Sequence, residues 1–253
     1  MNKTFIYRFI TVVTTLLTIT VNVLANALPI NGQGTGEISD RFAIYFVPEG
    51  YVFSIWGIIY LGLIAFVLYQ LLPGQKESDL IEKVSPAFWA ANLANTAWIF
   101  LWHYEFFPLT VVLMLTLLAS LLYLYLQVAR HGELTSGQKW LVKLPFSIYL
   151  GWISVATVAN VSQVLFYADW RGWGVAPEGW TVIMLVIAGG LGLAMRWREN
   201  DWAYGLVLIW ALVGIALKQS ESALVSNTAW VIAGVLALAL VSVPFIKRAP
   251  RKG

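Results

Sequence analysis

Long apolar stretches separated by short polar loops dominate the pattern of the chain. A helix needs about 20 predominantly apolar residues to cross the hydrocarbon core of a bilayer. Eight stretches approach or exceed this length, and the seventh is the weakest because it is short and ends at Lys218. They cover residues 5–28, 51–72, 86–102, 108–128, 140–166, 180–195, 202–217 and 223–246. The pattern predicts an all-α integral membrane protein with about eight transmembrane helices.

Composition supports a membrane location and excludes several other classes. Hydrophobic residues make up 59% of the 253 positions and charged residues only 11%, whereas soluble domains carry about 25% charged residues. The chain contains no cysteine, which excludes disulfides and thiolate metal sites. The net charge of +3 is spread over helix ends instead of one patch, so we expect no nucleic-acid partner.

Lys and Arg residues are distributed unequally between the two sets of loops. If all eight helices span, one side carries both termini and 13 of the 16 basic residues, and the other side carries only Arg41, Arg171 and Lys218. Basic residues accumulate in cytoplasmic loops. We therefore expect a multi-pass protein of a bacterial cytoplasmic membrane, with both termini in the cytoplasm.

The first apolar stretch has two interpretations. Lys3 and Arg8 precede it, and Ala25-Asn26-Ala27 resembles a signal-peptidase site. The apolar run is longer than the core of a typical signal peptide. We favour a retained helix.

The predicted loop 29–50 is the longest on the side opposite the termini. It is too polar to span and long enough to fold as a lid, with a flexible connector as the alternative. Pro48 and Gly50 stand at its end, where their backbone preferences favour a turn into the next helix.

Aromatic and amide side chains share one face in each of three predicted helices. Helical spacing and the direction of each helix place them at matching depths below the loop, with Asn95 and Trp152 nearer the middle of the bilayer. Apolar walls with a few placed polar groups are typical of a ligand pocket. Core packing, interfacial anchoring and hydrogen bonding between helices are the alternatives for each residue taken alone. The residues are Phe53, Trp56 and Tyr60 in the second helix, Asn95 and Trp98 in the third, and Tyr149, Trp152, Ala156 and Asn160 in the fifth.

Three motifs in register resemble the signature of the translocator protein family, also called tryptophan-rich sensory proteins. The resemblance covers about residues 5–170. The motifs are Pro48-x-Gly50-Tyr51-x-Phe53-x-x-Trp56-x-x-x-Tyr60, Leu93-Ala94-Asn95-x-x-Trp98 and Pro145-x-x-x-Tyr149-x-x-Trp152-x-x-x-Ala156-x-x-x-Asn160.

The resemblance implies a five-helix bundle that binds porphyrins, or in some members sterols, beneath its first loop, and that forms homodimers in many members. It implies that Pro48 and Gly50 set the lid. It also implies that the pocket is lined by Trp56 and Tyr60 from the second helix, Asn95 and Trp98 from the third, and Tyr149, Trp152, Ala156 and Asn160 from the fifth. The sequence departs from the pattern at Tyr51, where Trp is usual, and at Val155, where Phe is common. Three further helices follow the bundle, so we expect one domain at 1–170 and a C-terminal extension at 171–253.

These observations favour a membrane-embedded binding or sensory protein for a flat apolar ligand, with a porphyrin or other tetrapyrrole preferred and haem included. A transporter of small solutes, lipids or sterols is the first alternative, and a porphyrin-modifying enzyme is the second. We identify no catalytic residue, no metal site and no required cofactor. His103 would serve as a haem ligand or proton carrier, but we favour a surface histidine.

Overall fold

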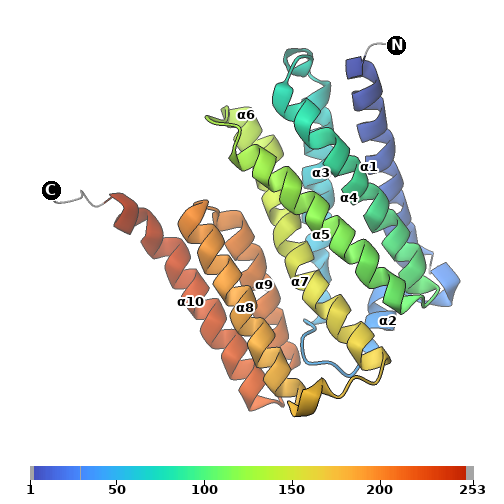
Figure 1. The fold of residues 1–253 in the computed structure, drawn as a ribbon, viewed down its shortest axis with the longest axis vertical. Helices are drawn as coiled ribbons and strands as arrows, with labels where there is room; N and C mark the ends of the chain where they lie inside the picture. The colour runs from blue at the N-terminus through green and yellow to red at the C-terminus, as the bar shows by residue number, and fades with distance from the viewer. Residues whose placement is uncertain (1–2, 29, 249–253) are drawn as a thin grey trace. The chain divides into compact units, whose positions relative to one another are not determined.

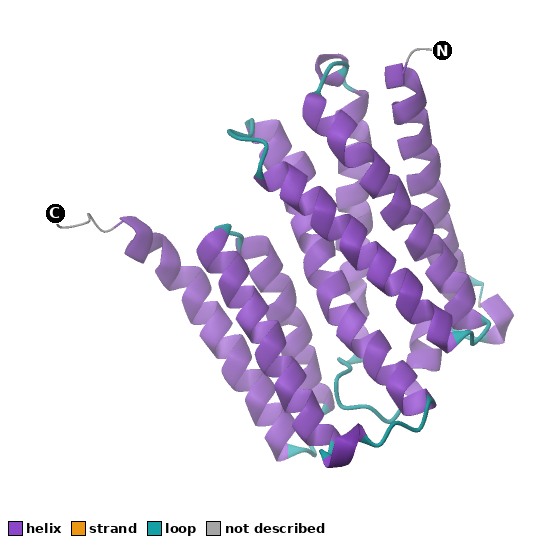
Figure 2. Cartoon of the chain, in the orientation of Figure 1, coloured by secondary structure: helices purple, strands orange, loops and turns teal. Residues whose placement is uncertain are grey.

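A computed structural model describes residues 3–28 and 30–248, with side chains described as far as residue 242. Residue 29, where the predicted lid loop begins, lies outside the described residues, as do residues 1–2 and 249–253 at the ends of the two predicted domains. The described residues form helices joined by loops and turns, without a strand among them (Figure 1, Figure 2). The prediction of an all-α membrane protein is confirmed.

Each predicted apolar stretch corresponds to one long helix. The long helices are α1 (Lys3–Ala27), α3 (Ile55–Leu71), α4 (Asp79–His103), α5 (Phe107–Ala129), α7 (Leu144–Tyr167), α8 (Pro177–Arg198), α9 (Trp202–Lys218) and α10 (Ala223–Arg248). The shorter elements are η1 (Ile30–Gly32), α2 (Thr35–Asp40), η2 (Gly50–Ser54), η3 (Pro73–Gln75), α6 (Ser136–Gln138), η4 (Lys139–Lys143) and η5 (Gly172–Gly174).

Length and composition allow six of the described helices to cross a membrane. They are Lys3–Ala27, Gly50–Leu71, Phe107–Ala129, Ser136–Tyr167, Pro177–Arg198 and Ala223–Ser242. Helix α4 is long enough but is not among them, because charged residues occupy its first turns and buried amides its middle. Helix α9, with 17 residues, is apolar but short.

The chain divides into two compact units. The first comprises residues 1–43 and 54–168, and the second comprises 44–53 and 169–253. In the first unit the helices form a closed ring of contacts in the order α1, α4, α5, α7, α3 and back to α1. In the second unit α8, α9 and α10 each contact the other two. Residues 44–53, which precede α3 in the chain, belong to the second unit.

Contacts at the two ends of the first unit agree with alternating helix directions. At one end Lys3 pairs with Glu82, and Arg8 donates to the carbonyl oxygen of Leu72 at 3.1 Å. At the other end Arg41 pairs with Glu105 at 2.8 Å. The start of α1 therefore lies beside the connection between α3 and α4.

A polar seam joins α1 to α4. The Thr18 and Thr96 hydroxyls lie 3.0 Å apart, and the Trp89 indole donates to the Thr11 hydroxyl at 2.8 Å. Such side-chain bonds between membrane helices contribute about 0.6 kcal/mol each on average. Helix α1 is thus integrated into the bundle along its length by hydrogen bonds as well as by apolar packing.

Candidate functional site

Four aromatic side chains from α3 and α7 form a continuous contact group in the first unit. Trp56 stacks on Tyr60, with ring centroids 5.5 Å apart and planes inclined by 23°. The Trp56 ring also meets Tyr149 edge-on at 5.9 Å and Trp152 at 6.3 Å. Tyr149 and Trp152 are buried, whereas Trp56 and Tyr60 are half-buried. The group therefore has a buried back on α7 and an accessible front on α3.

Asn95 connects this aromatic group to two further helices. Its amide nitrogen donates to the Tyr149 hydroxyl at 3.0 Å, and its oxygen accepts a bond of 2.7 Å from the amide nitrogen of Asn22. All three side chains are buried. A buried amide costs free energy unless it is hydrogen-bonded, so these pairings fix the Asn95 side chain between α1 and α7.

A second group lies further along the same helices. The Trp98 indole donates to the Asn160 oxygen at 3.4 Å, and the Asn160 amide nitrogen donates to the Thr110 hydroxyl at 2.9 Å. Trp98 stacks on Trp102 at 5.1 Å with planes 14° apart. The structure thus joins Trp98 to Asn160 through a group separate from Asn95 and Tyr149.

Helical spacing explains why these side chains meet. Residues three or four positions apart share a helix face, and Tyr149, Trp152, Ala156 and Asn160 follow one another on α7 at that spacing. Ala156 is half-buried and lies between the two groups in sequence. Between Trp152 and Asn160, this face of α7 therefore carries only the small side chain of Ala156.

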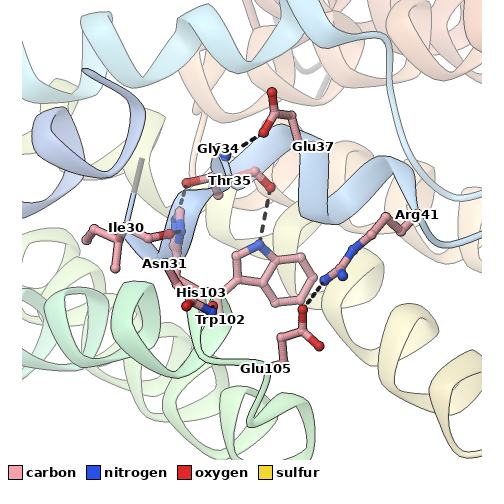
Figure 3. Close-up of polar contacts among 9 residues, drawn as sticks. All are labelled: Ile30, Asn31, Gly34, Thr35, Glu37, Arg41, Trp102, His103 and Glu105. Atoms are coloured by element: carbon pink, nitrogen blue, oxygen red, sulfur yellow. Dashed lines mark hydrogen bonds and ion pairs between the residues drawn. The ribbon is translucent and has the colours of Figure 1, made fainter. Parts of the chain in front are cut away.

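Residues 30–42 form a cap at the end of α4, and hydrogen bonds tie this cap down (Figure 3). The Trp102 indole donates to the carbonyl oxygen of Thr35 at 3.2 Å. The Asn31 amide donates to the carbonyl oxygen of His103 at 2.9 Å. From α7, the Gln163 amide donates to the Ser39 hydroxyl at 2.7 Å. The cap is therefore attached to both α4 and α7.

His103 is the centre of the cap attachment. Its Nδ1 lies 3.0 Å from the carbonyl oxygen of Ile30, and its Nε2 lies 2.9 Å from the Thr35 hydroxyl (Figure 3). Because a carbonyl oxygen only accepts, Nδ1 carries a hydrogen, and in the neutral ring Nε2 accepts from Thr35. His103 is fully buried. The prediction of a surface histidine is wrong, because both ring nitrogens bind cap residues, and haem ligation would break one of these bonds.

Three predicted site residues lie outside the first compact unit. Pro48, Gly50 and Phe53 belong to the segment 44–53, which lies in the second compact unit. Pro48 is buried there and Gly50 is exposed. The prediction that residues 29–50 form one lid over the pocket stays a prediction, because the structure divides that loop between the two units.

The described part of the chain contains no candidate metal site. Within residues 3–28 and 30–248, no three His, Asp or Glu side chains gather closely enough to hold a metal ion. The aromatic and amide groups are accordingly the features that define the candidate site.

Sequence reasoning missed two residues of the hydrogen-bonded groups, Asn22 and Thr110. A signal for Asn22 was present, because the polar residues Thr11, Thr14, Thr18 and Asn22 recur in the first apolar stretch at intervals of three or four. This spacing predicts one polar helix face. Thr110 offered no such periodicity, since it is the one hydroxyl in the first turn of α5.

Comparison with known protein families gives one match. A family model described as TSPO-like protein matches residues 8–242. The match extends beyond the region 5–170 that carries the resemblance and includes the C-terminal helices. No curated protein and no solved structure matches the chain. Since the family model covers most of the sequence, the chain belongs to the TSPO-like protein family.

Proposed function

We propose that this protein binds a flat apolar molecule of the porphyrin or tetrapyrrole class on the aromatic group of α3 and α7. The family makes it a membrane protein of the sensory or binding type. The observation that carries the proposal is the contact of Trp56 with Tyr60, Tyr149 and Trp152. A planar ligand stacks favourably on such rings, with about 0.5–1.5 kcal/mol per aromatic pair beyond area burial.

The accessibility of the four rings indicates where the ligand lies. Trp56 and Tyr60 are half-buried and nearly parallel, so together they present a stacking surface. Tyr149 and Trp152 are buried, and both contact the Trp56 ring. In the proposed complex the ligand stacks on the Trp56–Tyr60 pair, and rotation of Trp56 exposes Tyr149 and Trp152 to it.

Asn95 and Tyr149 supply the polar component of the proposed site. Because the Tyr149 hydroxyl accepts the bond from Asn95, its own single hydrogen is directed elsewhere. The unprotonated, imine-type nitrogens of a free-base tetrapyrrole and its propionate groups accept such a hydrogen bond. Mostly apolar walls with few convergent polar groups are the usual composition of small-molecule sites.

A titration with protoporphyrin IX tests the proposal. With 13 tryptophans, total fluorescence averages over sites unrelated to the ligand, so the shift of the porphyrin absorption band is the better signal. The double variant Trp56→Leu with Trp152→Leu removes two aromatic faces, and we expect the dissociation constant to rise at least about tenfold, equivalent to about 1.4 kcal/mol.

Trp140→Leu is the matched control. Trp140 is 59% exposed and lies outside the aromatic group, so this variant keeps the dissociation constant of the unaltered protein. Equal affinity in the double variant and the control would exclude the α3–α7 group as the binding site.

A further inference from the structure

The segment 44–53, immediately before α3, is held by the C-terminal helices. It belongs to the same compact unit as α8, α9 and α10. Its side chains from Phe46 to Pro48, together with Val52, are buried. A loop that buries this much apolar surface is fixed in position, in contrast to the usual solvated connector.

Main-chain and aromatic contacts attach the segment to α9. The Glu49 amide donates to the carbonyl oxygen of Gly214 at 3.2 Å. The Trp210 indole donates to the carbonyl oxygen of Val52 at 3.0 Å, and its ring meets Tyr51 edge-on at 5.2 Å. Gly214 and Trp210 are four residues apart, so one face of α9 makes all three contacts.

A further bond attaches the beginning of the segment to α8. The Tyr45 hydroxyl donates to the Glu178 carboxylate at 2.7 Å. This bond to a carboxylate raises the pKa of the Tyr45 hydroxyl, so the donor stays protonated. The segment is therefore attached at both of its ends.

Gly214 is the position at which this packing tolerates no side chain. A Cβ atom placed there would lie 2.2 Å from Cγ2 of Val52 and 3.0 Å from Cβ of Pro48. Both distances are shorter than the van der Waals separation of two carbon atoms, which is at least about 3.5 Å. Small residues at helix interfaces allow such close approach in membrane proteins. The absence of a side chain at Gly214 therefore allows the segment to pack this closely against α9.

The attached segment continues without interruption into the helix that carries the proposed stacking surface. Residues Gly50–Ser54 form η2, and α3 begins at the next residue, Ile55. Trp56 is the second residue of α3 and lies only four residues after Val52. A displacement of Val52 therefore reaches Trp56 through about one helical turn of backbone.

We propose that Gly214 and Trp210 are positioning residues for the ligand site. By holding residues 48–52, they restrain the backbone that leads, within four residues, to Trp56. This inference assigns the C-terminal helices a role in ligand binding, and its consequence for affinity rests on the proposed function.

A spin label at the start of α3 tests the inference without requiring a ligand. The chain has no cysteine, so Ser54→Cys, at an exposed position, provides a unique attachment site. In this background we expect Gly214→Ala to increase label mobility and to weaken protoporphyrin binding at least fivefold. Adding Val52→Ala removes the clashing methyl groups and should restore most of the label immobilisation and most of the porphyrin affinity. A general loss of folding would not be reversed by this second substitution.

Gly190→Ala is the control, because a Cβ at Gly190 meets nothing within 4 Å. Unchanged label mobility in Gly214→Ala would overturn the inference. Increased mobility with unchanged porphyrin affinity would overturn the link between this contact and the site. If the unaltered protein binds no protoporphyrin, the proposed function fails, and label mobility alone then decides whether Gly214 positions α3.

Discussion

At the scale of single residues, Asn95 is where three helices of the first unit meet through hydrogen bonds. It accepts from Asn22 on α1 and donates to Tyr149 on α7. Sequence reasoning identified Asn95 and Tyr149 from the helix faces that they occupy. It could not pair them, because periodicity gives the face of a helix but not which neighbouring helix lies opposite.

The first prediction concerns the donor to Asn95. Asn22→Leu leaves the buried Asn95 oxygen without its 2.7 Å bond, and we expect a loss of about 1–2 kcal/mol in the free energy of unfolding. Asn26→Leu is the matched control, because Asn26 lies one turn further on the same helix and is exposed. Reversible unfolding in detergent measures both, and equal stabilities of the two variants would contradict the assigned role of Asn22.

The second prediction concerns the cap. His103→Leu removes the bonds to Ile30 and Thr35. Amides in residues 30–38 should therefore exchange with deuterium at least about fivefold faster, since one net hydrogen bond contributes about 1 kcal/mol. His131→Leu replaces the other histidine and should leave this exchange unchanged. Slow exchange in the His103 variant would mean that other contacts hold the cap.

At the scale of elements, the long helices follow directly from apolar length, and their ends do not. Helix α4 begins at Asp79, seven residues before the predicted start at residue 86. Its first turns are polar, and the Ser78 hydroxyl accepts from the Ile81 amide as a cap. Helix α2 was not predicted, since its six residues lie in a polar loop. The apolar pattern detects the long apolar run of a helix and misses end turns that mix charged and apolar residues.

A buried arginine on α8 is hydrogen-bonded to the main chain of α10. Arg196 is buried and donates to the carbonyl oxygen of Leu240 at 2.9 Å. The helical donor to that oxygen would be residue 244, which is proline and has no amide hydrogen. Arg196 therefore satisfies a carbonyl that the proline leaves without its helical partner.

The third prediction tests this compensation with a double-mutant cycle. Arg196→Met should lower the free energy of unfolding by about 1.5–3 kcal/mol, the range for hydrogen bonds to charged groups. Pro244→Ala supplies a helical donor for Leu240, so it should stabilise the Arg196→Met variant more than it stabilises the unaltered protein. Equal effects of Pro244→Ala in the two backgrounds would show that the two residues are not coupled.

At the scale of the whole molecule, the sequence predicted the order of a five-helix part followed by three helices, and the motifs located the candidate site. It did not predict that residues 44–53 belong with the C-terminal helices. That grouping depends on Gly214 and Trp210, which lie over 150 residues further along the chain and have no distinctive local pattern. The family match over residues 8–242 agrees in including these helices.

The fourth prediction concerns orientation, which we infer from the 13 basic residues on the side of the termini. In the cysteine-free chain, Gly74→Cys lies in the loop before α4 and Glu221→Cys in the turn before α10, both exposed. A membrane-impermeant maleimide should label the second in intact cells and the first only after permeabilisation. The reverse result would place the termini outside the cytoplasm.

The most direct test of the central claim is a structure of the protein with protoporphyrin IX bound. We predict ligand density stacked on Trp56 and Tyr60 and in contact with Tyr149 or Trp152, within the bundle of α3, α4 and α7. Density elsewhere, with the rings of Trp56, Tyr149 and Trp152 still in their mutual contacts, would contradict the account.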